Sequence, residues 1–334
     1  MNEGIYILAN DVVFDQLVAL VNSIRVNTKK MYPICIIPYD DRLDKTRQYA
    51  EGCDAVSLLD DVALIERWEA FSAEIWQHSP AAIKDWQERG LEGVSRMGMH
   101  RRFCAFEGLF ERYIYLDADT LVLNELDIIF DKLNDHDWVV YDFQYKDITH
   151  VFDASSSKLK HVFSEGQLES IFCAGMYASK RNIFSQSQLD WLLEQLKEEA
   201  EILYYNGPDQ SIVNYMTLKL GIDVCNLSKT LAEQEVTGCC VTSPHFEQKN
   251  GYLLDKGVRL TYLHYIGISS KVFKRLCQGE NLDFPYRDIF LHYRYLNAPE
   301  DFPDFNEPLR SYQPPPLSMT KKLKRKFSKI FGND

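Results

Sequence analysis

The stretch RYIYLDADTLVLNELD, residues 112–127, places two carboxylates one residue apart at the end of an aromatic and aliphatic run. The apolar part is typical of a buried strand, so Asp117 and Asp119 follow at its carboxyl end. Two like charges this close favour a bound cation, and carboxylate oxygens suit Mg²⁺ or Mn²⁺. The alternative is a solvated aspartate pair that opens a turn, because a bare Asp-x-Asp is common by chance.

Outward from this strand, short apolar runs alternate with segments of helical periodicity. The expected strands are GIYIL, YPICIIPY, AVSLL, DWVVYDF, IFCAGMYAS and VRLTYLHYIG. Helices are expected over residues 11–27 and 42–51, through Arg101 to Phe110, and from SQLDWLL, GPDQSIV and SKVFKRLC. Strands that alternate with helices predict a largely parallel sheet of the α/β class.

Composition limits the class of protein. The chain has 334 residues, is 46% hydrophobic and carries a net charge of −12, so it can bury a large core and does not resemble a nucleic-acid binder. Its eight cysteines show no zinc-ligand spacing, and its first residues have neither the basic start nor the apolar core of a signal peptide. We therefore expect a cytoplasmic protein with reduced thiols.

The C-terminal region differs from the rest. We expect one domain over residues 1–297, a Pro-rich linker over 298–319 and a basic amphipathic tail over 320–334. The last fourteen residues hold six Lys or Arg and one Asp. As a helix the tail would present one apolar face, which suits peripheral docking to an anionic membrane surface. A solubilising tail and an RNA-binding arm are the alternatives.

Further segments extend the pattern set by the aspartate pair. They are YILANDVVFDQLVALVNSIRVN, MHRRFCAFEGLFERYIYLDAD, FCAGMYAS, GPDQSIVNYM and LHYIGISSK. With YLDADTLVLNELDIIFD, they resemble in order the glycogenin-like, family 8 glycosyltransferases with the GT-A fold. The resemblance spans roughly residues 5–275. It implies a Rossmann-like, mostly parallel central sheet flanked by helices, in a bacterial enzyme of polysaccharide biosynthesis.

The resemblance also implies residue roles. The metal ligands for Mn²⁺ or Mg²⁺ would be Asp117, Asp119 and His264. The nucleotide-sugar would be bound by Ala9, Asn10, Asp11, Arg101, Asp117, Ala118, Gly175, Gly267 and Lys271. Asp209 and Gln210 would lie at the reacting face as the catalytic pair. The cation would stabilise the departing nucleoside diphosphate.

Each role has a plain structural alternative. Asn10 and Asp11 could cap a helix, and Asp209 could be an N-cap after Pro208. His264 could be a hydrogen-bonded histidine at a strand end, Gly175 a strand irregularity, and Arg101 and Lys271 surface cations. The chain also departs from the family pattern. Cys173 stands where the family usually shows Asn, and Lys271 comes one position late, with no Pro-Trp after it.

Together these features predict a glycosyltransferase that moves a hexose from a nucleotide-sugar, a UDP-sugar, to a glycan or lipid-linked acceptor. Retention of configuration is implied by the resemblance alone. One alternative is a catalytically inactive nucleotide-sugar-binding scaffold at the membrane. Another is a phosphatase of the haloacid dehalogenase type. Such phosphatases carry Thr two residues after the second Asp, whereas Thr120 follows Asp119 directly.

Overall fold

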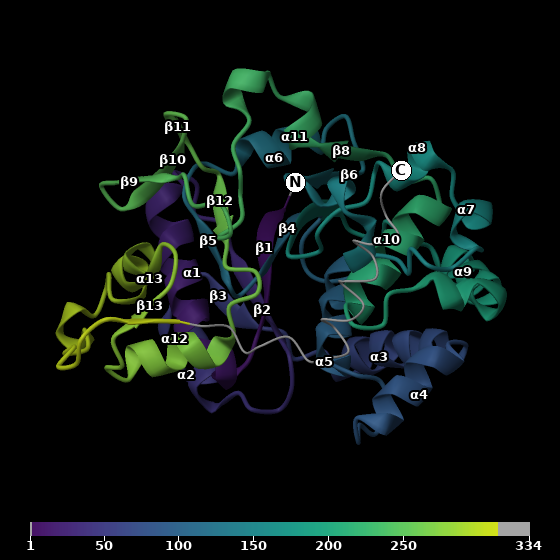
Figure 1. The fold of residues 1–334 in the computed structure, drawn as a ribbon, viewed down its shortest axis with the longest axis horizontal. Coiled ribbons are helices and arrows are strands. Elements are labelled where there is room, and N and C mark those ends of the chain that lie inside the picture. The colour runs from purple at the N-terminus through teal and green to yellow at the C-terminus, as the bar shows by residue number, and fades with distance from the viewer. Residues whose placement is uncertain (1, 313–334) are drawn as a thin grey trace.

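The computed structural model describes residues 2–312, so the predicted tail at 320–334 and residues 313–319 lie outside the described part. A seven-stranded sheet in the order β3-β2-β1-β4-β7-β6-β8 forms the centre (Figure 1). Its strands are β1 (Glu3–Ala9), β2 (Ile34–Pro38), β3 (Val56–Leu58), β4 (Arg112–Asp117), β6 (Trp138–Val140), β7 (Met176–Lys180) and β8 (Val224–Asn226).

The sheet is mixed rather than uniformly parallel. Strands β3, β2, β1 and β4 run parallel, as the alternating pattern predicts. Strand β7 is antiparallel to both of its neighbours, β4 and β6, while β6 and β8 are parallel to each other. The predicted strand IFCAGMYAS forms only from Met176 onward, because residues 172–175 are taken up by contacts with the site described below.

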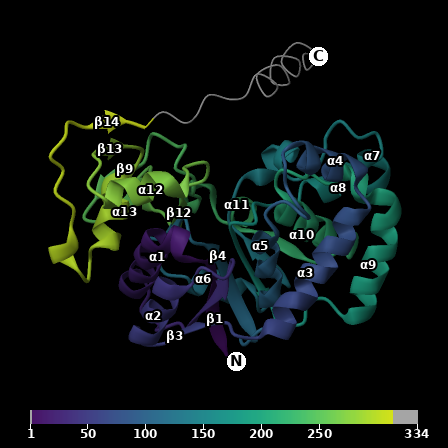
Figure 2. The same ribbon diagram turned by 90° about the horizontal axis from the view of Figure 1, so that it is seen from below.

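Helices cover both faces of the sheet, and Figure 2 shows the two groups on opposite sides. On one side lie α1 (Phe14–Asn27), α2 (Asp44–Gly52), α6 (Asp127–Lys132), α12 (Ser270–Cys277) and α13 (Arg287–Arg294). On the other lie α3 (Val62–Gln77), α4 (Pro80–Glu88), α5 (Met97–His100), α7 (Leu159–Val162), α8 (Glu165–Leu168), α9 (Gln186–Glu199) and α10 (Pro208–Lys219). The short α11 (Leu227–Thr230) follows β8.

Alternation along β1 shows why two faces are covered. Tyr6 and Leu8 pack into an aromatic-rich core with α3, α9 and α10, whereas Ile5 and Ile7 pack into a second core with α1 and α6. A strand that is apolar on both faces must be buried on both, which is typical of parallel sheets. A third core unites α12, α13 and the small C-terminal strands.

In the part of the chain that the structure describes, residues 2–312, three small sheets complete the fold. Strand β5 (Thr120–Val122) pairs with β12 (Tyr262–His264). β9 (Glu247–Lys249), β10 (Tyr252–Asp255) and β11 (Val258–Arg259) form a meander, and β13 (Leu282–Asp283) pairs with β14 (Arg310–Ser311). The predicted strand VRLTYLHYIG is thus divided between β11 and β12. Residues 298–312, the first part of the predicted linker, return to α12 and α13 through β14 and Phe305.

One predicted helix takes a different form. The stretch expected to be helical from Arg101 to Phe110 is a 3₁₀-helix, η2 (Arg101–Phe106), that directly follows α5. A 3₁₀-helix turns more tightly than an α-helix, so adjacent side chains point in directions that the 3.6-residue period does not predict. Within residues 2–312, no helix has the length and apolar character needed to cross a membrane.

Candidate metal and nucleotide-sugar site

The aspartate pair lies in the turn between β4 and β5. Strand β4 ends at Asp117 and β5 begins at Thr120, whose hydroxyl donates to the Asp117 carbonyl at 2.8 Å. Asp117 is in register with Leu8 near the end of β1, so it lies close to the segment that follows Ala9. Ligand sites in such sheets form outside the carboxyl ends of the strands, as predicted for this pair.

The pairing of β12 with β5 brings His264 next to Asp117 and Asp119. β12 runs antiparallel to β5 and sets His264 opposite Thr120, and the Tyr265 N–H donates to the Asp119 carbonyl at 2.8 Å. On its other side His264 donates its N–H to the Cys239 carbonyl at 2.7 Å. The imidazole Nε2 lies 3.3 Å from Asp119 Oδ1. One ligand atom from each of Asp117, Asp119 and His264 falls within 4.8 Å of the others.

This set of donor atoms fits a divalent cation. Two carboxylate oxygens and one imidazole nitrogen suit Mn²⁺ or Mg²⁺, with positions left for other oxygen ligands. The other imidazole nitrogen, Nδ1, lies 4.0 Å from Cys173 Sγ. A proton on Nδ1 would point toward the sulfur and leave the Nε2 lone pair for a metal. A Cβ on Gly175 would overlap the His264 ring, so only glycine allows this approach.

We call Asp117, Asp119 and His264 the metal cluster, since they could hold an ion. A buried arginine links this cluster to the start of α10. Arg102 Nη2 lies 2.9 Å from Asp117 Oδ1 and 3.1 Å from Asp209 Oδ2, and its Nη1 donates to the Ala174 carbonyl at 2.7 Å. Only 1% of Arg102 is exposed. The Tyr115 hydroxyl adds a 2.8 Å hydrogen bond to the same Asp117 oxygen. The cation Arg102 therefore fixes two of the carboxylates that the sequence singled out.

Sequence reasoning selected the neighbouring arginine instead. Arg101 donates from Nε to Glu69 at 2.6 Å and from Nη1 to the Pro38 carbonyl, at the end of β2. Its role at the donor diphosphate stays a prediction. The two arginines are adjacent in sequence, and only the path of η2 decides which one turns toward Asp117.

The charges at the cluster influence one another. Burial raises the pKa of Asp117, Arg102 opposes that rise, and the charge on Asp119 adds to it. Burial is also the largest influence on Asp119 and acts to raise its pKa, but the charge and hydrogen bond of His264, a backbone N–H and the charge on Arg102 together hold that pKa below its ordinary value. The pKa of His264 is correspondingly raised by Asp119 despite burial. Without a cation, the imidazolium offsets the carboxylate charge, so a metal ion would compete with its proton.

Asp209 and Gln210 lie in the first turn of α10, after Gly207 and Pro208. Asp209 is 4% exposed and faces Arg102. It is not the helix cap that the sequence also allowed, because the N-cap residue is Gly207 and no side chain caps this end. Gln210 bridges two segments: its Oε1 accepts from the Ala174 N–H at 2.9 Å, and its Nε2 donates to the His150 carbonyl at 2.9 Å. Both residues are thereby linked to the 174–175 segment behind His264.

The other predicted donor-site residues occupy three places. The Asn10 side chain caps η1 (Asp11–Val13) through the Val12 N–H, and Asp11 accepts from Thr46 at the start of α2, so both also have capping roles. Ala9 and Ala118 are buried in the core beside α1. Gly267, with φ +84°, lies between β12 and α12, and the exposed Lys271 lies in the first turn of α12. Their roles toward a nucleotide-sugar stay predictions.

Sequence reasoning missed Asp142, which follows β6. Its side chain is 3% exposed, and its two oxygens accept from Gln144 N–H at 2.7 Å and Cys173 N–H at 3.2 Å. Burial raises the pKa of Asp142 to about 7. The only signal in the sequence was an acidic residue inside DWVVYDF, which we read as the end of a strand.

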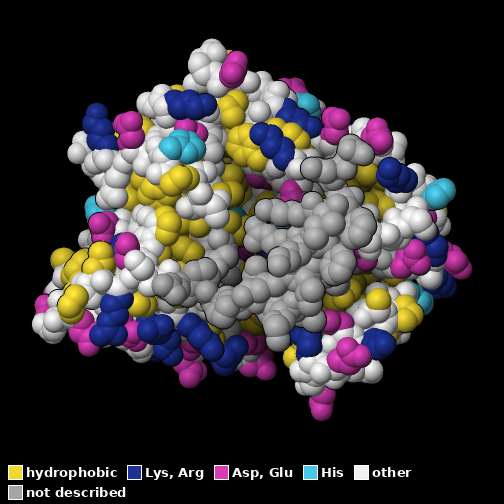
Figure 3. Space-filling view, viewed as in Figure 1, with side chains coloured by type: hydrophobic (Ala, Val, Ile, Leu, Met, Phe, Trp, Pro, Cys, Tyr) yellow, Lys and Arg dark blue, Asp and Glu magenta, His cyan; other side chains and the backbone are white. Residues whose placement is uncertain are grey.

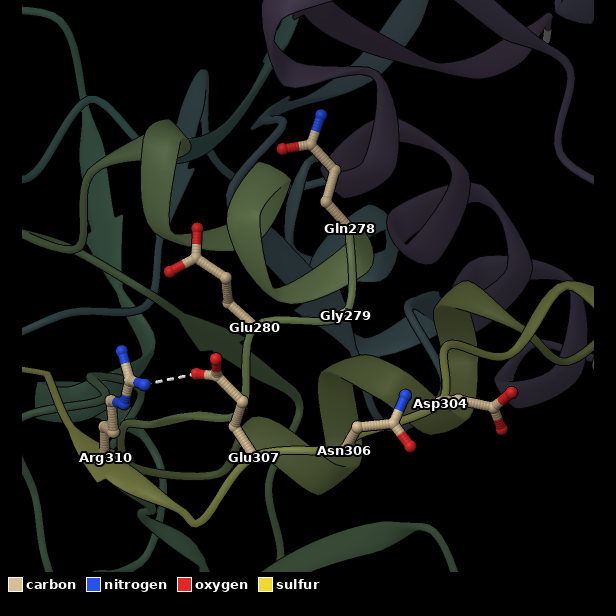
Figure 4. A pocket seen from close by; sticks show the side chains of 7 residues that line it. All are labelled: Gln278, Gly279, Glu280, Asp304, Asn306, Glu307 and Arg310. Carbon is tan, nitrogen blue, oxygen red and sulfur yellow. Dashed lines mark ion pairs between the residues drawn. The ribbon is translucent and has the colours of Figure 1, made fainter.

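A surface hollow of about 360 Å³ lies away from this site (Figure 4). It is lined by Gln278, Gly279, Glu280, Asp304, Asn306, Glu307 and Arg310. Two of its carboxylates are already paired, Glu280 with Arg275 and Glu307 with Arg310. None of its residues belongs to the metal cluster, so the hollow gives no support to a second reaction centre.

No protein-family model and no curated protein sequence matches this chain. Solved structures do. The bifunctional glycosyltransferase WbbM superposes with a TM-score of 0.53 at 16% identity, over 89% of this chain and 50% of WbbM. The galactosyltransferase LgtC, in complex with donor and acceptor sugar analogs, superposes with a TM-score of 0.50 at 15% identity, over 82% of this chain and 94% of LgtC.

An active-site variant of LgtC, in which a glutamine is replaced by glutamate, gives the same TM-score of 0.50 over 83% of this chain. The chain spans half of the length of WbbM but nearly all of LgtC. At these identities the likeness establishes the fold. The chain has the GT-A fold of nucleotide-sugar glycosyltransferases, as the sequence predicted.

Proposed function

We propose that this protein is a metal-dependent glycosyltransferase that transfers a hexose from a UDP-sugar to a glycan acceptor with retention of configuration. One observation carries the proposal: Asp117, Asp119 and His264 converge at the carboxyl end of β4, in a fold shared with LgtC. LgtC is described with donor and acceptor sugar analogs, which supports a site for two sugars. We further propose membership of the bacterial family 8 enzymes.

The chain's own residues would act in three ways. Asp117, Asp119 and His264 would hold Mn²⁺ or Mg²⁺, which when bound neutralises charge on a diphosphate leaving group. Arg102 holds Asp117 and Asp209 in place at 2.9 and 3.1 Å, so neither carboxylate has to be ordered when substrate arrives. Gln210, fixed through both ends of its amide, would present its side chain to the donor sugar as the residue nearest the reaction.

The test combines ligand-induced stabilisation with turnover. Thermal denaturation is followed with UDP-glucose, UDP-galactose, UDP-N-acetylglucosamine and GDP-mannose, each with and without Mn²⁺. A ligand present at 100 times its Kd stabilises the folded state by about 2.7 kcal/mol. We expect a UDP-sugar to do so only with Mn²⁺, and Asp119→Asn to abolish both this effect and Mn²⁺-dependent UDP release. Asp131→Asn, on the exposed side of α6, is the matched control.

Three results would change the proposal. Normal UDP release by Asp119→Asn would show that the metal site is assigned to the wrong residues. Binding of a UDP-sugar by the wild type without turnover, over a broad acceptor panel, would favour the inactive scaffold. Phosphate release from phosphomonoesters would favour the phosphatase, for which the comparisons give no support.

We also propose that the protein is cytoplasmic and docks peripherally through residues 320–334. The charge and apolar spacing of the sequence support this, since each basic group contributes about 1 kcal/mol near an anionic leaflet. Deletion of residues 320–334 should abolish sedimentation with phosphatidylglycerol vesicles and leave donor hydrolysis unchanged. Unaltered sedimentation would refute docking through the tail.

A further inference from the structure

The segment 143–150 is attached to the candidate site at both of its ends. At the start, Asp142 accepts from the Cys173 N–H at 3.2 Å, and the Cys173 sulfur lies 4.0 Å from His264 Nδ1. At the far end, the His150 carbonyl accepts from Gln210 Nε2 at 2.9 Å. The segment therefore runs along the site from the metal cluster to the predicted reacting face.

Two aromatic rings lie near the start of this segment. Phe143 and Tyr145 have ring centroids 6.4 Å apart, and both side chains are partly exposed. Tyr145 packs against the core that contains α3 and α9, whereas Phe143 belongs to none of the three cores. A large ring next to a buried Asp142, left without a core of its own, is better suited to a ligand than to packing.

Two lysines cover these rings. Lys146 Nζ lies 4.7 Å from the Phe143 centroid, and Lys229 Nζ lies 4.2 Å from that of Tyr145. Lys229 Nζ donates to the Glu169 carbonyl at 2.7 Å. Lys146 is exposed, and among the described residues its Nζ lies over the rings of Phe143 and Tyr145 and makes no ion pair or hydrogen bond. Figure 3 shows hydrophobic side chains beside basic ones in the upper centre of the face, where α11 lies in Figure 1.

We propose that residues 143–150 form the acceptor-binding wall, in which a pyranose ring of the acceptor glycan stacks on Phe143. A hexose presents a face of C–H groups that packs on an aromatic ring, while its rim of hydroxyls needs polar partners. Lys146 supplies such a partner, because its flexible side chain can leave the ring and reach a hydroxyl. The proposal rests on the proposed glycosyltransferase function and names the residues that take its acceptor.

The attachment of segment 143–150 at both ends also explains where a bound acceptor would lie. A sugar on Phe143 would lie along a segment whose start is bonded to the loop behind His264 and whose end is bonded to Gln210. An acceptor held there would face the donor side without contacting Arg102 or Asp209, which are buried. Donor binding and acceptor binding are therefore separable by mutation.

The experiment measures sugar binding and turnover on the full-length protein. Methyl β-D-galactopyranoside, methyl α-D-glucopyranoside and methyl β-lactoside are the probes, with UDP and Mn²⁺ present, and binding is followed by saturation-transfer NMR. For a glycoside that also serves as acceptor, KM and kcat are measured with the UDP-sugar donor. UDP release without glycoside reports the donor half of the site alone. The variants are Phe143→Ala, Phe143→Tyr and, as an exposed aromatic on α9, Trp191→Ala.

We expect saturation transfer to ring C–H protons of at least one glycoside in the wild type. Phe143→Ala should raise the Kd or KM for that glycoside about ten-fold or more, with glycoside-independent UDP release within about two-fold of wild type. Phe143→Tyr should restore binding to within about three-fold, since it keeps the ring, and Trp191→Ala should change nothing. Because Phe143 lies outside the cores, these variants should keep the wild-type melting temperature.

Three outcomes would contradict the proposal that residues 143–150 bind the acceptor. They are binding of no glycoside by the wild type, equal binding by Phe143→Ala and Trp191→Ala, or a parallel loss of glycoside-independent UDP release in Phe143→Ala. Failure of the proposed function is seen separately, as an absence of Mn²⁺-dependent UDP binding and release in the wild type. In that case the NMR measurement still decides whether Phe143 binds a sugar.

Discussion

The two sides of the candidate site are built differently. On the metal side, Asp117 and Asp209 face Arg102, and Asp119 faces His264. Asp117 ends β4 of the central sheet, and His264 is fixed by the pairing of β12 with β5. On the opposite side, residues 143–150 are tied down at Asp142 and His150, while the rings between them are partly exposed and covered by lysine side chains. Buried ion pairs hold the first side before any ligand arrives, whereas the rings of the second side are partly open to solvent.

The difference follows from the chemistry each side would handle. A cation and a diphosphate demand fixed ligands, because their charges are strongly attracted at short range and a loose site loses that attraction. A sugar face on an aromatic ring tolerates shifts of its position. We therefore expect substitutions on the metal side to cost stability or metal affinity, and substitutions on the other side to change little except acceptor binding.

The largest effect is expected from Arg102→Met. Removal of the guanidinium leaves the buried carboxylates of Asp117 and Asp209 without their cation, which should cost about 3–5 kcal/mol of unfolding free energy. Urea denaturation of the metal-free protein measures this loss. Arg101→Met removes a partly exposed pair with Glu69 and should cost about 1 kcal/mol or less. Equal losses in the two variants would show that Arg102 does not organise the site.

Next comes Gly175→Ala. The added methyl group would overlap the His264 ring and push it away from Asp119, so Mn²⁺ affinity should fall about 10- to 100-fold. Titration of Mn²⁺ followed by electron paramagnetic resonance measures the Kd. In Gly166→Ala the methyl group meets no neighbouring atom, so affinity should stay unchanged. A Gly175→Ala protein that binds Mn²⁺ normally would exclude His264 as a ligand in this position.

A smaller, pH-dependent effect is expected from Asp142→Asn. With a pKa of about 7 in the folded state, Asp142 keeps its proton at pH 5, whereas in the unfolded chain it is ionised above about pH 4. The wild type therefore loses stability from this group as pH rises from 4 to 7, and the loss is complete above 7. Asparagine cannot ionise, so the variant should gain about 2–3 kcal/mol relative to wild type between pH 5 and pH 8.

Urea denaturation of both metal-free proteins at pH 5, 6.5 and 8 tests this expectation. The quantity of interest is the difference in unfolding free energy between variant and wild type, which removes the contributions of all other titrating groups. A difference that stays constant with pH would mean that Asp142 is ionised in the folded protein throughout this range.

The smallest effect is expected from Lys146→Ala. Its ammonium contacts only partly exposed rings, so unfolding free energy should change by about 0.5–1 kcal/mol or less. Lys219→Ala is the contrasting variant, since Lys219 Nζ bonds both oxygens of Glu199 at 2.7 Å in a mostly buried pair and should cost more. If Lys146→Ala were the more damaging of the two, segment 143–150 would be part of the rigid framework.

Much of the fold could be predicted from local patterns. The strands that became β1, β2 and β4 are continuous apolar runs, which is the expected pattern when both faces are buried, and helix α9 shows its apolar spacing clearly. The aspartate pair was found because it directly follows such a run. His264 was found only through resemblance, since the pairing of β12 with β5 joins segments far apart in sequence.

The features that could not be predicted depend on the direction in which individual side chains point, which the pattern of hydrophobic residues does not report. The choice between Arg101 and Arg102 is made by the 3₁₀ geometry of η2, and hydrophobic periodicity does not report which of two adjacent side chains turns inward. Asp142 escaped notice because its burial results from β6 ending at Val140, two residues before it. Phe143 ends the predicted strand DWVVYDF, and only the packed structure shows that it belongs to none of the three cores.

The pairing of β5 with β12 has a consequence for how the protein is made. Asp117 and Asp119 leave the ribosome long before His264, and the cluster stays incomplete until β12 has been synthesised and has paired with β5. A nascent chain shorter than this carries the two carboxylates with Arg102 but lacks the imidazole. Cation binding by all three side chains would therefore wait until β12 has been made, so the timing of synthesis itself separates folding of the N-terminal sheet from assembly of the candidate metal site.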